Sequence, residues 1–134
     1  MASPASEVLS IRTDSDIVLA RQRVRYWTQQ FQFSLVDQTK FVTAASELAR
    51  NTLEHGHGGQ LTIEALTYET RSGIRLTFED AGPGIPNLEL ALKDGFTTGT
   101  GMGLGLGGSK RLVNEFDIET TVGKGTKVSV VRWK

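Results

Sequence analysis

The sequence lacks cysteine, net charge and any long apolar run. Without cysteine, the chain can form neither a disulfide bond nor a thiolate metal site, and a reducing compartment fits this composition. A formal net charge of +0 provides no bulk field to attract nucleic acid or an anionic membrane. No apolar run approaches the ~20 residues of a membrane-spanning helix, and residues 1–16 do not have the pattern of a secretory signal. We therefore expect a cytoplasmic protein that binds neither nucleic acid nor membrane.

Glycine, by contrast, is abundant and concentrated in one segment. The 134 residues, 38% of them hydrophobic, are enough for a single domain spanning residues 1–134. Seven of the 15 glycines lie within residues 95–110, and so much backbone freedom predicts a loop. Because Met102, Leu104 and Leu106 are interleaved with these glycines, a loop that folds over a ligand is favoured over a disordered tether.

The hydrophobic periodicity predicts a strand, two helices, two strands, a loop region with a helix, and two strands. Asp14 or Ser15 is expected to cap the first helix and Ser34 the second. The expected strands are 7–13, 60–69, 73–80, 117–122 and 126–133, with a turn at 71–73, a second helix at 35–55, a short helical piece at 87–94 and a helix at 106–116. Antiparallel strands separated from helices indicate an α+β fold, a two-layer sandwich of a mixed, mostly antiparallel sheet with helices on one face.

The second expected helix carries a carboxylate and an amide one turn apart. Glu47 and Asn51 lie at the margin of the apolar stripe, because each residue of a helix advances about 100°. Their oxygens could share a hard cation, or one could bind metal while the other accepts a proton. An ordinary polar helix edge is the alternative, and it is favoured when this segment is considered alone. The apolar stripe consists of Phe41, Ala45, Leu48 and Thr52.

Asp80 ends an expected strand, and Gly82 and Gly84 follow it. A carboxylate there can accept a hydrogen bond from an exocyclic amine, while the glycines allow a planar ring to approach the backbone. A tight strand-ending turn is an equally good explanation, because Asp, Gly and Pro all favour turns.

The glycine-rich loop is followed by the start of a helix, a combination that suits phosphate oxygens. Gly103, Gly105 and Gly108 satisfy the dinucleotide pattern literally. However, no strand precedes them and the chain lacks alternating parallel units, so this reading is rejected. The P-loop pattern is missing as well.

Taken together, three segments resemble the GHKL superfamily, the ATPases and kinases of gyrase, mismatch-repair, heat-shock-chaperone and histidine-kinase type. SELARN at 46–51 resembles its N box, DAGPGIP at 80–86 its first glycine box, and GTGMGLGLGG at 99–108 its second. The resemblance implies a Bergerat-type ATP-binding fold. The lead-in LKDGFTTG and the final VVRW are similar to the small bacterial anti-sigma and stressosome switch serine/threonine kinases.

The resemblance also implies roles for residues of the N box. Glu47 would be the general base that takes the proton from a substrate hydroxyl. Asn51 would supply an oxygen to Mg²⁺, which bridges the phosphates of ATP. Arg50 would face either phosphate or a protein partner.

The glycine boxes would bind the nucleotide. Asp80 would accept a hydrogen bond from adenine N6, Gly82 and Gly84 would leave space for the ring, and Thr126 would reach the adenine edge. The second box would close over the phosphates as a lid. Its expected ATP-binding residues are Gly99, Gly101, Met102, Gly103, Leu104, Gly105 and Leu106.

The function implied by this resemblance is an ATP- and Mg²⁺-dependent serine/threonine protein kinase. Its substrates would be STAS-domain antagonist or scaffold proteins of a bacterial stress-response partner switch. A PP2C-type phosphatase would be a further partner, once the STAS-domain proteins release the kinase. The alternatives are an anti-sigma factor that sequesters a sigma subunit and a plain ATP hydrolase. The sequence does not predict an oligomeric state.

Overall fold

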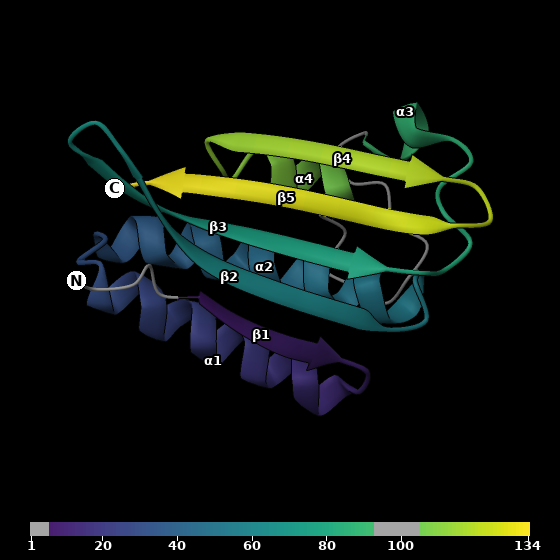
Figure 1. Ribbon diagram of the computed structural model, residues 1–134, viewed down its shortest axis with the longest axis horizontal. Helices are drawn as coiled ribbons and strands as arrows, with labels where there is room; N and C mark the ends of the chain where they lie inside the picture. Colours follow the sequence, from purple (N-terminus) through teal and green to yellow (C-terminus); the bar gives the residue numbers. More distant parts are fainter. Residues whose placement is uncertain (1–5, 93–104) are drawn as a thin grey trace.

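The computed structural model describes residues 6–92 and 105–134 and has two layers, a sheet and helices on one of its faces (Figure 1). The elements are β1 (Ser6–Ile11), α1 (Asp14–Gln30), α2 (Leu35–Glu54), β2 (Gly59–Tyr68), β3 (Arg71–Asp80), α3 (Leu88–Ala91), α4 (Gly105–Lys110), β4 (Glu115–Thr121) and β5 (Gly125–Trp133). The α+β class and the predicted order of elements are confirmed.

The sheet has five strands in the order β1-β2-β3-β5-β4, and each of its four neighbouring pairs is antiparallel. This arrangement is simpler than the mixed sheet that was expected. Two helices separate β1 from β2 along the chain, so the chain runs back along the sheet in α1 and forward again in α2 before β2 begins. That double crossing places β2 antiparallel to β1, whereas a single crossover helix would make them parallel.

The N-cap of helix α1 lies one residue before Asp14 and two before Ser15, the two predicted caps. Thr13 is the N-cap: the Asp16 amide donates to its hydroxyl at 3.3 Å, and the Thr13 amide donates back to the Asp16 carboxylate at 3.2 Å. This reciprocal capping box replaces the predicted cap by Asp14 or Ser15. Asp14 instead lies in the first helical turn, where its charge complements the helix dipole.

Helix α2 matches its prediction closely. Ser34 is the N-cap and accepts from the Asp37 amide at 3.1 Å, and the helix ends one residue before the predicted boundary. The predicted apolar stripe is buried, and it packs with α1 against the sheet. The largest buried side chains of this core include Phe41, Leu48, Leu61, Ile63, Ile74, Leu76 and Phe78.

Two boundaries differ from the sequence-based expectation. The β2–β3 turn lies at residues 69–70 rather than 71–73, because Tyr68 already pairs with Arg71 and Glu69 takes a φ of 55°. The helix expected at 106–116 ends at Lys110, and β4 begins at Glu115. Pairing of β4 with β5 and packing of its alternate apolar side chains on the core override the local helical pattern.

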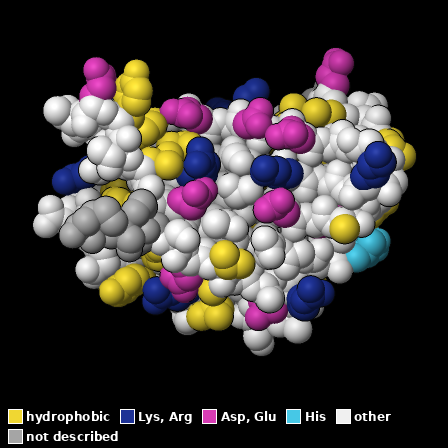
Figure 2. Space-filling view, viewed as in Figure 1, with side chains coloured by type: hydrophobic (Ala, Val, Ile, Leu, Met, Phe, Trp, Pro, Cys, Tyr) yellow, Lys and Arg dark blue, Asp and Glu magenta, His cyan; other side chains and the backbone are white. Residues whose placement is uncertain are grey.

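The face of the sheet away from the helices is polar and open to solvent. Figure 2 shows positive and negative side chains side by side on this face. Residues of β2, β3, β4 and β5 line an open depression of 630 Å³ there. Three carboxylates, Glu115, Asp117 and Glu119, come from the edge strand β4. The other charged residues of the depression are Glu64, Arg75, Glu79 and Lys127. In the described part of the chain, no helix combines the length and apolar character needed to cross a bilayer.

A polar contact fastens the edge strand β1 to helix α1. The Arg23 guanidinium donates to both Glu7 oxygens, at 2.8 and 2.9 Å, and the Trp27 indole donates to Glu7 at 2.9 Å. The hydrogen bond from Arg23 is the main reason that the pKa of Glu7 lies below its ordinary value. The folded protein therefore binds a proton at Glu7 less readily than the unfolded chain does.

The Glu7 contact predicts a pH dependence of stability. Because the folded-state pKa is lowered, the stabilisation is complete above the ordinary value of 4.5 and is lost as the pH falls below it. Between about pH 6 and about pH 3, wild-type protein should lose more free energy of unfolding than Glu7→Gln, as measured by urea denaturation. Parallel pH curves for the two proteins would show that Glu7 contributes no such linkage.

Candidate functional site

The end of α2 meets the end of β3 through backbone that carries no side chains. A Cβ atom on Gly56 would lie 2.3 Å from the Asp80 carboxyl carbon, and one on Gly82 would lie 2.7 Å from the Gly56 Cα. Distances this short are excluded for real side chains, so both positions require glycine. The two glycines therefore allow the Asp80 turn to lie directly against the C-terminal end of α2.

Asp80 presents one free carboxylate oxygen at this junction. It pairs with Gly59 on one side and Thr126 on the other, and its side chain shares the helix-facing side of β3 with Phe78. Its Oδ1 atom accepts from the Gly82 amide at 3.0 Å. Within residues 6–92 and 105–134, no group donates to Oδ2. A half-buried acceptor is thus available for a donor group. The expected contact of Asp80 with adenine N6 stays a prediction.

Thr126 lies directly opposite Asp80 in the pairing of β3 with β5. Its hydroxyl is 2.9 Å from the Thr120 hydroxyl, and either can donate. Thr120 accepts from the Ile85 amide at 2.9 Å, and its single hydroxyl hydrogen can be donated either to Thr126 or to the Gly125 carbonyl at 3.3 Å. The Thr120–Thr126 pair therefore holds the Thr126 hydroxyl in place beside Asp80.

The turn that contains Gly84 is attached to the β4–β5 hairpin. Gly84 has a φ of +78°, and a Cβ there would lie 2.4 Å from the Thr121 carbonyl oxygen. The Gly123 amide donates to the Pro83 carbonyl at 2.7 Å. The prediction that this segment is a tight strand-ending turn and the prediction that it frames a ligand site are compatible, since the same turn holds Asp80 and Gly82 in place.

Glu47 and Asn51 lie on α2 towards this junction. The Asn51 carbonyl accepts from the His55 and Gly56 amides at 2.9 and 3.2 Å, so the Asn51 turn directly precedes the glycine that touches Asp80. Asn51 is half-buried, whereas Glu47 is buried, with only 6% of the residue exposed. No described residue hydrogen-bonds to the Glu47 carboxylate. Glu47 is therefore a shielded carboxylate one helical turn from the amide side chain of Asn51.

Arg50 forms an ion pair with Glu54 along α2, with 3.8 Å between Nη1 and Oε2. Both side chains are about 30% exposed, and an ion pair at this exposure contributes little to stability. Its expected role towards phosphate or a partner stays a prediction.

The second glycine box is described only from its C-terminal end. Gly105 is the first residue of α4, and Leu106 is buried in the core. Helix α4 packs beside α2, which is consistent with a helix start near the N box. The remaining predicted residues, Gly99, Gly101, Met102, Gly103 and Leu104, lie outside the described residues.

The oxygens of Glu47 and Asn51 are chemically suited to Mg²⁺. This cation prefers hard oxygen ligands and is commonly bound by one or two protein oxygens together with substrate phosphates. Across the described residues, no three His, Asp or Glu side chains gather as a complete metal site. The donor set fits a cation that arrives with phosphates and is held from the protein side by Asn51.

Sequence reasoning missed two residues of the site. Gly56 was not singled out as a site residue, although its lack of a side chain is what admits Asp80. Thr120 was not singled out, although the register of the terminal hairpin pairs it with Thr126. The hairpin register could have indicated Thr120, whereas the Gly56 contact joins elements distant in sequence and has no local signature. The depression on the open face is on the other side of the sheet and is not this site.

Comparison with known proteins finds relatives over most of the chain. The family model of histidine kinase-, DNA gyrase B- and HSP90-like ATPases matches residues 36–134. The chain is 42% identical to serine/threonine-protein kinase RsbT of Bacillus subtilis over 123 residues, 92% of each protein. It is 31% identical to an anti-sigma F factor of Thermoanaerobacter, covering 85% of this chain and 82% of that protein.

Solved structures show the same fold. The RsbU and RsbW domains of a Mycobacterium tuberculosis protein align over 99% of this chain with a TM-score of 0.66 and 20% identity. This chain spans 33% of that one. A mycobacterial sensor histidine kinase, MprB, aligns over 96% of this chain and 97% of its own, with a TM-score of 0.56 and 19% identity. The matches confirm the resemblance seen in the sequence: the chain belongs to the family of histidine kinase-, DNA gyrase B- and HSP90-like ATPases.

Proposed function

We propose that this chain is an ATP- and Mg²⁺-dependent kinase that phosphorylates serine or threonine on STAS-domain antagonist or scaffold proteins. The observation that carries the proposal is the junction of α2 and β3. It places the Asp80 acceptor against the end of the helix that bears Glu47 and Asn51. The 42% sequence identity to a serine/threonine-protein kinase over 92% of the chain supports the reaction type.

In this mechanism each residue acts on a different part of the reactants. Asp80 accepts from the adenine amine, Thr126 contacts the ring edge, and Gly82 allows the ring to approach. Mg²⁺, when bound through Asn51 and the phosphates, would neutralise charge on the phosphate oxygens. Glu47 accepts the proton of the substrate hydroxyl as the new O–Pγ bond forms and the bond to ADP breaks. Positioning and shielding from water are then the main contributions of the fold.

The proposed setting is a bacterial stress-response partner switch in the cytoplasm. A PP2C-type phosphatase is the proposed second partner, engaged when the STAS-domain protein has been phosphorylated. The similarity to a structure that includes RsbU and RsbW domains supports the fold of this module, and the curated RsbT relative supports its place among switch kinases.

A second function is sequestration of a sigma subunit. The observation that favours it is the similarity to anti-sigma F factors over most of the chain. Both functions include ATP binding, so nucleotide affinity does not distinguish them. A sigma subunit that co-purifies with the chain in place of a STAS-domain protein would favour sequestration.

The kinase proposal predicts transfer of radiolabelled γ-phosphate from Mg·ATP to a purified STAS-domain protein of the source organism. The label should resist acid, because phosphoserine and phosphothreonine are stable in acid whereas phosphohistidine is not. Omission of Mg²⁺ should abolish the label. ATP binding without transfer to any of the organism's STAS-domain proteins would contradict the kinase proposal and favour the anti-sigma function.

A further inference from the structure

Arg132 is a charged residue on the helix-facing side of the sheet. In the alternation of β5 it follows Val128 and Val130, both of which are buried in the core. Its side chain therefore enters the space between the layers, and only 14% of it is exposed. A cation in such a place is costly unless it is paired and hydrogen-bonded, so the partners of Arg132 define what it does.

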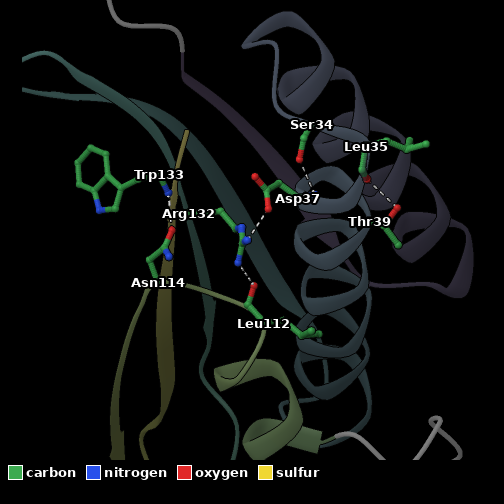
Figure 3. A network of polar contacts seen from close by, with 8 residues as sticks. All are labelled: Ser34, Leu35, Asp37, Thr39, Leu112, Asn114, Arg132 and Trp133. Atoms are coloured by element: carbon green, nitrogen blue, oxygen red, sulfur yellow. Dashed lines mark hydrogen bonds and ion pairs between the residues drawn. The ribbon is translucent and has the colours of Figure 1, made fainter.

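The Arg132 guanidinium joins two elements of the helical layer (Figure 3). Its Nη2 atom donates to Asp37 Oδ1 at 2.5 Å, and its Nη1 atom donates to the Leu112 carbonyl at 2.9 Å. Asp37 lies in the first turn of α2, and Leu112 lies two residues beyond α4. The hydrogen bond from Arg132 holds the pKa of Asp37 below its ordinary value, so the carboxylate stays ionised.

The two elements joined by Arg132 are those that build the candidate site. Helix α2 carries Glu47 and Asn51, and α4 begins at Gly105 in the second glycine box. The Leu112 amide donates to the Ser109 carbonyl at 3.0 Å, which ties Leu112 to α4. A shift of Leu112 would therefore move α4 relative to α2, and with it Gly105 relative to Glu47.

Stability alone does not explain an arginine at this position. A largely buried ion pair is often no more stabilising than apolar side chains of similar volume. Among the described residues, the buried Arg132 Nε has no hydrogen-bond partner, which adds a cost. What arginine offers is a rigid fork that donates in two directions, and lysine cannot reproduce this geometry.

We propose that Arg132 is a positioning residue for phosphoryl transfer, which holds the α4 end of the glycine box at a fixed separation from α2. This inference rests on the proposed function, because it concerns the alignment of the same site. Arg132 does not touch the reactants in this role. It acts through Asp37 and Leu112.

The test is a kinetic comparison of substitutions in the Arg132 contact. Arg132→Met keeps the apolar stem and removes both donors, so kcat for transfer should fall about 10-fold through misalignment, with a smaller change in the KM for ATP. Arg132→Lys should recover only part of kcat. Asp37→Asn keeps an oxygen acceptor without its charge, and it should lower kcat by less than Arg132→Met does.

Arg75→Met is the matched control. Arg75 also pairs with a carboxylate, Glu64 at 3.1 Å, but on the open face of the sheet and with 40% of its side chain exposed. This substitution should leave kcat unchanged. Hydrogen exchange gives a readout independent of activity: the Leu112 and Asn114 amides should exchange faster in Arg132→Met and at the wild-type rate in Arg75→Met.

Each outcome of these measurements decides the proposal. Wild-type kcat in folded Arg132→Met would overturn it, whether or not the exchange of the Leu112 and Asn114 amides changes. If Arg132→Met does not fold, wild-type kcat in both Arg132→Lys and Asp37→Asn would overturn it, and reduced kcat at an unchanged unfolding midpoint would support it. A wild-type protein that transfers no phosphate would contradict the proposed function itself, whereas normal transfer by Arg132→Met contradicts only the positioning role.

Discussion

Glu47→Gln should lose phosphoryl transfer by about 10²–10⁴-fold while it retains ATP binding. The glutamine has nearly the same shape as the buried glutamate, so the packing of α2 on the sheet should be preserved. The amide of glutamine cannot accept the hydroxyl proton, and proton acceptance is the only property that the proposed mechanism requires of Glu47. Single-turnover transfer to the STAS-domain protein, together with the Kd for a fluorescent ATP analogue, separates the two effects.

The control for Glu47 is a glutamate that lies away from the site. Glu64→Gln, on the open face of the sheet, should transfer phosphate at the wild-type rate. Wild-type transfer by Glu47→Gln would remove Glu47 from the role of general base. A parallel loss of ATP binding and thermal stability in Glu47→Gln would instead assign it a structural role in α2.

Asp80→Asn should weaken ATP binding by roughly 10–100-fold, the equivalent of losing one hydrogen bond to a charged group. The structure indicates which atom matters. Oδ1 is engaged by the Gly82 amide, so the amide oxygen of asparagine should occupy that position and retain the turn. The amide nitrogen then replaces Oδ2 and presents a donor to the adenine amine, which is itself a donor. Isothermal titration with ATP measures the change.

Two further measurements test the role of Asp80: the preference for ATP over ITP, and ATP binding by a variant of the neighbouring carboxylate Glu79. Asp80→Asn should lose discrimination between ATP and ITP, because ITP has a carbonyl where ATP has the amine. Glu79→Gln, one residue earlier and on the opposite face of β3, should bind ATP like wild type. Unchanged ATP affinity in Asp80→Asn would exclude Asp80 from the adenine contact.

The parts of this fold that were predictable are those determined by local chemistry. The Ser34 cap and the buried stripe of α2 follow from side chains within a few turns of each other, and both were predicted. The boundary between α4 and β4 was not predicted, because Glu115 and Phe116, which continue the local helical pattern, pair with β5 instead. The N-cap of α1 was misplaced by one residue, since Thr13 and Asp16 together satisfy more backbone groups than Asp14 could.

The candidate site likewise has one part that could be predicted from local sequence and one part that could not. Glu47 and Asn51 could be paired from helical spacing, and Asp80 from its place at a strand end. The contact of Gly56 with Asp80 and the fork of Arg132 between Asp37 and Leu112 could not be predicted. Both join segments distant in sequence, and neither a lone glycine after a helix nor a lone arginine in a terminal strand indicates its partner.

The edge strand β4 has a consequence for the behaviour of this protein at high concentration. Among the described strands, β4 has a neighbour on one side only. A strand edge of this kind offers unpaired amide and carbonyl groups, and a second chain can add to it as a further strand. Glu115, Asp117 and Glu119 project from one side of β4, so two copies approaching edge to edge would bring three negative charges against three. Repulsion between these carboxylates hinders the addition of a strand from a second copy, and with it the aggregation that such pairing would start. The sheet therefore tends to end at β4.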